Sequence, residues 1–124
     1  ALVAQFEPRI AYAIPIMPAV RLDRVFWRAR LTRQVRAGLR KQGLTPQLTA
    51  QALKTIFPGR YPLAIGPQRV LLMQGSADRV VFPEYTVRLA QRWGAKLVLS
   101  GHSHVTELFG ISTRRRIQSF LSEI

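Results

Sequence analysis

Two short, almost uninterrupted apolar runs, separated by one amphipathic stretch, constrain the fold of this chain more than any other feature. RVLLMQG at residues 69–75 and AKLVLS at residues 95–100 have the length and composition of strands buried on both faces of a parallel sheet. Residues 83–94 between them predict a helix, because a proline opens the stretch and a glycine ends it. Residues 112–124 predict a closing helix. This alternation of strands and helices predicts an α/β fold with a parallel sheet.

Each of the two predicted helices shows an apolar face that we expect to pack against the sheet. In the first helix this face comprises Phe82, Leu89, Ala90 and Trp93, and in the closing helix it comprises Ile117, Phe120, Leu121 and Ile124.

The beginning of the chain gives looser signals. Residues 1–7 are typical of the last turns of a helix that a following proline stops. Residues 8–20 predict a buried strand with prolines toward its far end. We expect this strand to join the same sheet.

Residues 21–62 predict a helical region. A first helical stretch begins at Leu22 and is ended by Gly43. A second begins at Thr45, because a capping hydroxyl there precedes a proline, and it runs to about Ile56. A loop rich in proline and glycine then leads to the first of the two apolar runs. The apolar side chains at helical spacing in the first stretch are Leu22, Val25, Phe26, Ala29, Leu31, Val35 and Leu39.

The net charge of +13, from 19 Lys plus Arg against 6 Asp plus Glu, favours anionic partners through long-range attraction. The basic side chains are scattered, however, and those of the densest run, residues 21–41, would point in several directions on a helix. We therefore expect a solvated, arginine-rich surface, and we do not expect nucleic acid as the partner, because no zinc or helix-turn-helix signature is present. A membrane-surface role for the helix that carries Phe26 and Trp27 would need a cleaner apolar face.

The absence of cysteine excludes disulfides and thiolate metal sites. The longest apolar stretch, residues 10–20, is too short to span a bilayer and contains two prolines. No secretory leader is visible, so the location stays open and the cytoplasm is favoured. Because the chain begins at Ala1 inside sequence that already has structured character, we expect it to be a segment of a longer protein.

Three chemically active side chains follow the two predicted strands. Asp78 comes just after the first strand, and His102 and His104 come just after the second. Functional groups in open α/β sheets collect beyond the carboxyl ends of the strands, and adjacent parallel strands bring such loops side by side. An aspartate that orients an imidazole makes up two thirds of a hydrolytic triad, in which the ring takes a proton from a nucleophile.

Each of these residues also has a structural interpretation. An aspartate after a strand is commonly a turn residue that caps the next helix by accepting backbone N–H bonds, and a loop histidine is commonly structural or solvated. A metal site could combine His102 and His104 with Asp78 or Glu107, but no second cluster of ligands accompanies them, so we expect no metal and no other cofactor. The positions of the acid and the histidines after successive strands favour an acid–histidine pair.

Residues 69–124 resemble the C-terminal end of an α/β-hydrolase. Gly75, two variable residues, Asp78 and the apolar run RVVFP are similar to the acid loop of this family, in which the acid precedes the histidine. The resemblance implies that Asp78 is the catalytic acid.

KLVLSGHSH is similar to the last strand and the histidine loop of the family. When Leu99 and Gly101 are set on the leucine and glycine of that loop, His104 falls on the catalytic histidine, and the apolar Val105 after it fits the pattern. The resemblance therefore favours His104, with His102 as the alternative.

Residues 8–68 resemble the family more loosely. Residues 8–20 look like the strand that follows the nucleophile helix, and residues 21–62 look like the helical cap that many members insert there. In that arrangement one group of aromatic side chains would line an acyl pocket, although such side chains are more commonly part of the core. This group comprises Phe26, Trp27, Phe57 and Tyr61.

One feature of the family is missing, namely the glycine-x-serine-x-glycine turn that carries the nucleophile. The resemblance thus implies that residues 1–124 are one partial domain of a serine esterase or related acyl hydrolase, inactive alone, whose nucleophile lies outside this chain. A small acyl compound would be the substrate of the full-length protein. The missing N-terminal half would cover an exposed edge of the sheet, which otherwise invites self-association. The alternative is a non-catalytic basic module of the same fold that binds an anionic partner or nucleic acid.

Overall fold

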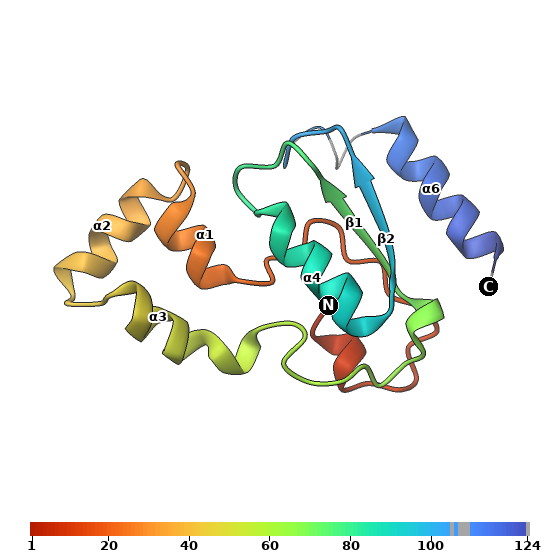
Figure 1. The fold of residues 1–124 in the computed structure, drawn as a ribbon, viewed down its shortest axis with the longest axis horizontal. Helices are drawn as coiled ribbons and strands as arrows, with labels where there is room; N and C mark the ends of the chain where they lie inside the picture. The colour runs from red at the N-terminus through yellow and green to blue at the C-terminus, as the bar shows by residue number, and fades with distance from the viewer. Residues whose placement is uncertain (105, 107–109, 124) are drawn as a thin grey trace.

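The computed structural model of the chain describes residues 1–104, 106 and 110–123 (Figure 1). Its α-helices and strands form a mixed α/β structure with a parallel sheet, as the sequence predicts. Val105, Glu107 and Ile124, which figure in the expectations above, lie outside the described residues. The elements are η1 (Val3–Gln5), α1 (Leu22–Arg28), α2 (Arg33–Lys41), α3 (Pro46–Leu53), η2 (Lys54–Ile56), η3 (Pro67–Arg69), β1 (Leu71–Gly75), α4 (Pro83–Trp93), β2 (Lys96–Ser100) and α6 (Ile111–Ser122), where η marks a 3₁₀ helix.

Strands β1 and β2 pair in parallel, with Leu71 opposite Lys96 and Gly75 opposite Ser100. β1 is buried along its whole length, as its continuous apolar sequence predicts. β2 is only partly buried, and Leu99 is 48% exposed, so the prediction that this strand is covered on both faces is wrong. The reason is its position at an edge of the described sheet, where it pairs with β1 alone.

A segment at residues 13–17 lies along the other side of β1. Residues 8–20 do not form the continuous strand that the sequence predicts, because Pro15 and Pro18 have no N–H to donate and Met17 turns the backbone with a φ of 46°. The segment nevertheless makes parallel bridges, from Ala13 to Val70 just before β1 and from Ile16 to Met73 within β1. Its hydrogen bonds run from Ala13 N to Arg69 O (2.9 Å), from Leu71 N to Ala13 O (3.0 Å), from Met73 N to Pro15 O (3.0 Å) and from Met17 N to Met73 O (2.8 Å).

The outer edge of this segment is unpaired in the described chain. Backbone groups of an extended strand point alternately to its two sides, so Ile14 and Ile16 direct their N–H groups away from β1. No backbone hydrogen bond joins either N–H group to another described residue. The side chain of Tyr12 next to them is exposed. A further strand could therefore add at this edge.

Helix α4 covers one face of the sheet. Three of the four side chains predicted to face inward are buried there, while Phe82 packs in a separate cluster with the start of the helical region. Phe82 precedes the first turn of α4, so its side chain leaves the helix in a different direction. The buried cluster between α4 and β1 includes Val70, Leu72, Leu89, Ala90 and Trp93.

Helix α6 covers the opposite face. Phe120 is buried against Leu71 and Met73, and Ile117 packs against the same cluster, as predicted. Leu121 is 38% exposed, so its predicted place in the inner face is wrong. A helix turns by about 100° per residue, and the position after Phe120 therefore points away from the sheet.

The long helical stretch predicted from residue 22 onward is broken into α1 and α2. The hydroxyl of Thr32 lies within 3.1 Å of carbonyl oxygens at the end of α1, and Arg36 donates to the carbonyl of Trp27 at 2.9 Å. These side chains satisfy the carbonyl groups that a continuing helix would have used, so the chain can turn. Leu31 and Val35, predicted to continue the apolar face, are exposed.

Helix α3 begins as predicted, because Thr45 accepts a hydrogen bond from the backbone N–H of Leu48 at 3.2 Å and Pro46 follows it. Together with η2 it ends at Ile56, which confirms the predicted boundary. Helices α1, α2 and α3 lie to one side of the sheet and its covering helices (Figure 1). None of the helices in the described ranges is long and apolar enough to cross a membrane.

Candidate functional site

The loops that follow β1 and β2 leave the sheet at the same end. Their strands are parallel and in register at Gly75 and Ser100, so the first residues of both loops are neighbours. The backbone N–H of Ser76 donates to the carbonyl of Ser100 at 2.7 Å, and that of Ala77 donates to the carbonyl of His102 at 3.3 Å. These bonds hold the acid loop and the histidine loop together.

Gly75 allows this close approach. A Cβ atom at this position would lie against the backbone carbonyl of His102, at a separation that real Cβ atoms do not show. The carbonyl is backbone and cannot swing away as a side chain could. Close packing against this carbonyl therefore requires glycine at the position three residues before Asp78.

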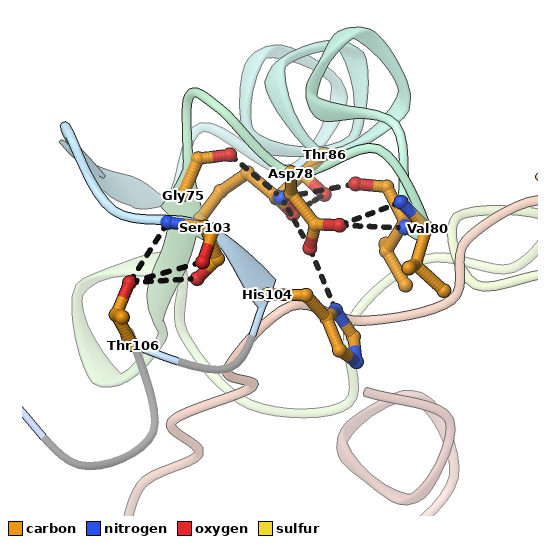
Figure 2. Close-up of polar contacts among 9 residues, drawn as sticks. Gly75, Asp78, Val80, Thr86, Ser103, His104 and Thr106 are labelled. Atoms are coloured by element: carbon orange, nitrogen blue, oxygen red, sulfur yellow. Dashed lines mark hydrogen bonds and ion pairs between the residues drawn. The ribbon is translucent and has the colours of Figure 1, made fainter. Parts of the chain in front are cut away.

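Asp78 and His104 are in hydrogen-bond contact. Nδ1 of His104 lies 2.8 Å from Oδ2 of Asp78, which is the pairing that the sequence predicts (Figure 2). The carboxylate side chain is fully buried, whereas the imidazole side chain is 35% exposed. Because a carboxylate offers only acceptors, Nδ1 carries the hydrogen and donates it, which leaves the other ring nitrogen, Nε2, as an acceptor.

The second oxygen of Asp78 belongs to the turn that follows β1. Oδ1 accepts the backbone N–H groups of Val80 at 2.8 Å and Val81 at 3.0 Å (Figure 2). One oxygen thus closes the turn and the other orients the imidazole. The predicted capping of the next helix by Asp78 is wrong, because Phe82 is the residue before α4 and the first turn of α4 has no side-chain cap. The turn fixes the carboxylate before any ligand arrives.

Gln74 supports the same carboxylate and was not singled out by the sequence reasoning. Its amide nitrogen lies 3.1 Å from the carbonyls of Gly75 and Val81 and 3.4 Å from Oδ2 of Asp78. Thr86 on α4 donates to the amide oxygen at 2.8 Å, and both side chains are completely buried. The signal in the sequence was a glutamine inside an otherwise apolar strand, since a buried amide requires partners.

Nε2 of His104 is the ring nitrogen that the contact with Asp78 leaves available. It points away from Asp78 in Figure 2, and within the described chain it has no hydrogen-bond partner. A neutral imidazole held in this tautomer can accept a proton from a hydroxyl, and the buried carboxylate then stabilises the imidazolium that forms.

His102 occupies a different environment. Its Nε2 lies 3.3 Å from the hydroxyl of Ser112, and it has no contact with a carboxylate among the described residues. Of the two histidines, His104 is therefore the one placed for acid–histidine chemistry. The described residues contain no group of three side chains arranged to hold a metal ion, and Glu107 lies outside them.

The four aromatic side chains considered for an acyl pocket are divided between two places. Trp27 donates to the hydroxyl of Thr49 at 3.0 Å and so packs α1 against α3. Phe57 and Tyr61 line a pocket of about 600 Å³, to which neither Phe26 nor Trp27 contributes. Asp78 and His104 do not line that pocket either. The structure therefore does not bring the four aromatics together over the acid–histidine pair.

Comparison of the chain with protein-family models, with curated proteins and with solved structures gives no match. The geometry at the ends of β1 and β2 is therefore the basis on which a function can be proposed.

Proposed function

We propose that this chain is the C-terminal portion of a serine hydrolase of the α/β-hydrolase fold. In this proposal Asp78 is the acid and His104 the histidine of a catalytic triad, and the nucleophilic serine lies outside the chain. The observation that carries the proposal is the 2.8 Å contact between a buried carboxylate and a half-exposed imidazole. The two side chains follow neighbouring parallel strands, where functional groups of α/β sheets collect.

The chemistry is that of acyl transfer to a hydroxyl. The serine oxygen would attack the acyl carbon of an ester or related substrate, and Nε2 of His104 would take the hydroxyl proton. The same proton would pass to the leaving alkoxide as the tetrahedral intermediate collapses. A water molecule would then attack the acyl-enzyme and lose its proton to Nε2. The imidazolium would pass that proton to the departing serine oxygen as the acid is released. Asp78 keeps its negative charge throughout and stabilises the imidazolium.

The rest of the proposed domain could add its strands at the unpaired edge of the described sheet. We propose that the unpaired edge at Ile14 and Ile16 receives the strand that carries the nucleophile, which would bring the serine beside the histidine loop. Helices α1 to α3 would then correspond to the cap of the family. Without the other half, this chain has no serine hydroxyl bonded to His104 among its described residues, and we expect it to be inactive alone.

The test is the activity of the full-length protein on short-chain p-nitrophenyl esters. The proposal expects a glycine-x-serine-x-glycine motif upstream of Ala1 and measurable turnover. Asp78→Asn should lower kcat by roughly 10⁴-fold, because an asparagine can hold the ring in the wrong tautomer. A full-length protein that lacks the motif, or an Asp78→Asn variant that keeps its kcat, would refute the proposal.

A further inference from the structure

A second candidate site lies beside α4. The segment leading into α1, the chain from Lys54 to Tyr61 and one face of α4 line an open pocket of about 600 Å³. Arg88 and Arg92 lie four positions apart on α4, so their side chains leave the helix on the same face. The pocket shares no lining residue with the Asp78–His104 pair.

The lining of this pocket carries positive charge without any negative charge. Its basic side chains are Arg21, Lys54, Arg60, Arg88 and Arg92, and its lining contains no aspartate or glutamate. Arg21 is already neutralised, because it binds Asp23 through two hydrogen bonds of 2.8 and 2.6 Å. That carboxylate raises the pKa of Arg21 above its ordinary value. The other cations form no ion pair with any described residue.

No described acid is left to neutralise these cations. Every aspartate and glutamate in the described ranges already has a cationic or imidazole partner, and the remaining acid of the sequence, Glu107, lies outside them. The pairs are Glu7 with Arg9, Asp23 with Arg21, Asp78 with His104, Glu84 with Arg28 and Glu123 with Lys96. Like charges around one cavity raise its positive potential, and a bound anion would relieve that repulsion.

The floor of the pocket is apolar. Val20 and Leu89 are buried beneath the charged rim. The guanidinium of Arg21 lies 4.9 Å from the ring centre of Phe57 and 5.8 Å from that of Tyr85, so it joins the two walls. A volume of about 600 Å³ lies within the range of small-molecule sites and far exceeds the volume of one phosphate group.

We propose that this pocket binds a small organic phosphate. The phosphate groups would lie on the rim, where arginine offers paired donors that match phosphate oxygens. The organic part would cover the apolar floor. The four cations without an ion pair are exposed, so a ligand can reach them from solvent. This site does not depend on the hydrolase chemistry, because its residues and those of the acid–histidine pair are separate.

The experiment is calorimetric titration of the chain with ATP, used as a probe of this ligand class, at about 0.15 M salt, where charges beyond about 8 Å are screened. The proposal expects one ATP per chain, weaker binding of inorganic pyrophosphate, and no detectable binding of adenosine. The double variant Arg88→Gln/Arg92→Gln should weaken ATP binding by at least about tenfold, because it removes two cationic donors to the phosphate groups. Lys54→Gln, on another wall, should weaken it as well.

The matched control is Arg30→Gln/Arg33→Gln, which removes the same charge from exposed positions that do not line the pocket. This control should leave the affinity within about twofold, and circular dichroism should show that all variants fold. Equal losses in the two double variants, or several weakly bound ATP molecules per chain, would overturn the proposal by showing diffuse charge attraction. Binding only to phosphatidic acid vesicles, unchanged in the pocket variant, would overturn it too.

Discussion

Gly75 lies directly against the backbone carbonyl of His102, so the end of one strand and the loop after the next are in contact through backbone atoms. This contact places the acid loop and the histidine loop at a fixed separation. The 2.8 Å bond between Asp78 and His104 forms across that junction. The geometry of the site therefore depends on this backbone contact at the strand ends as well as on the two side chains.

The substitution Gly75→Ala should disrupt this junction. Its Cβ would collide with the His102 carbonyl, and relief requires a shift of the histidine loop, which we expect to cost about 1–3 kcal/mol of unfolding free energy. Urea denaturation measures that loss. We expect the Nδ1 proton of His104 to give a strongly deshielded nuclear magnetic resonance signal in the intact pair, and this signal should weaken or disappear in the variant.

Gly101→Ala provides the control, because a Cβ there meets nothing within 4 Å. Its stability and its His104 signal should match those of the unmodified chain. If both glycine variants behave alike, the close contact at Gly75 does not position the histidine loop.

Gln74 should act as a positioning residue for Asp78. Gln74→Leu removes an amide that bridges the carbonyls of Gly75 and Val81, and it leaves these buried groups and the Thr86 hydroxyl without their partner. We expect a loss of about 1–3 kcal/mol in unfolding free energy. The His104 Nδ1 resonance should also broaden, because the turn that fixes Asp78 loosens.

A double-mutant cycle with Thr86→Val separates this network from simple loss of packing. Thr86 binds the amide oxygen of Gln74 at 2.8 Å, so the two substitutions should be non-additive by about 0.5 kcal/mol or more. Strict additivity of the two changes in unfolding free energy would contradict the network.

The open sheet edge should make the isolated chain self-associate. Ile14 and Ile16 direct their N–H groups outward, and Tyr12 is exposed beside them. Tyr12→Lys places a charge on this edge and should shift the chain toward monomer in sedimentation velocity, as lysine does at natural sheet edges. Leu31→Lys, at an exposed apolar residue between α1 and α2, should not change association. If both substitutions reduce self-association equally, general surface hydrophobicity causes the association and the sheet edge does not.

The ion pair between Lys96 and Glu123 should give α6 a pH dependence. The hydrogen bond from Lys96 lowers the pKa of Glu123 below its ordinary value. A carboxyl group with a depressed pKa in the folded state stabilises the fold above its unfolded pKa, and that contribution is lost as pH falls through the folded pKa. Carbon-detected titration should show the lowered pKa of Glu123, and Lys96→Met should return it toward the ordinary value. An unchanged titration in Lys96→Met would contradict the contact.

The second half of the fold could be predicted because its signals are local. The continuous apolar run before Gly75, the proline that opens α4 and the glycine after Trp93 each mark an element without reference to distant residues. Asp78 and His104 could be paired because parallel strands bring their following loops together.

The first half could not be predicted as well, because distant hydrogen bonds determine it. The break between α1 and α2 depends on Thr32 and Arg36, whose side chains reach carbonyls of the preceding helix. The helical spacing of the apolar residues does not reveal these side-chain hydrogen bonds. Because the helix breaks there, Leu31 and Val35 face solvent. The roles of Gln74 and Thr86 were missed for a similar reason, since a buried polar pair is visible only when both partners are placed.

The central claim, that His104 is the catalytic histidine of a hydrolase, is tested most directly by the kcat of the full-length protein on p-nitrophenyl butyrate in two variants. His104→Ala removes the ring bound to Asp78, and His102→Ala removes the neighbouring ring bound to Ser112. The account predicts a loss of roughly 10³-fold or more in kcat for His104→Ala and a change of a few fold for His102→Ala. Full activity in His104→Ala, or an equal loss in both variants, would contradict it.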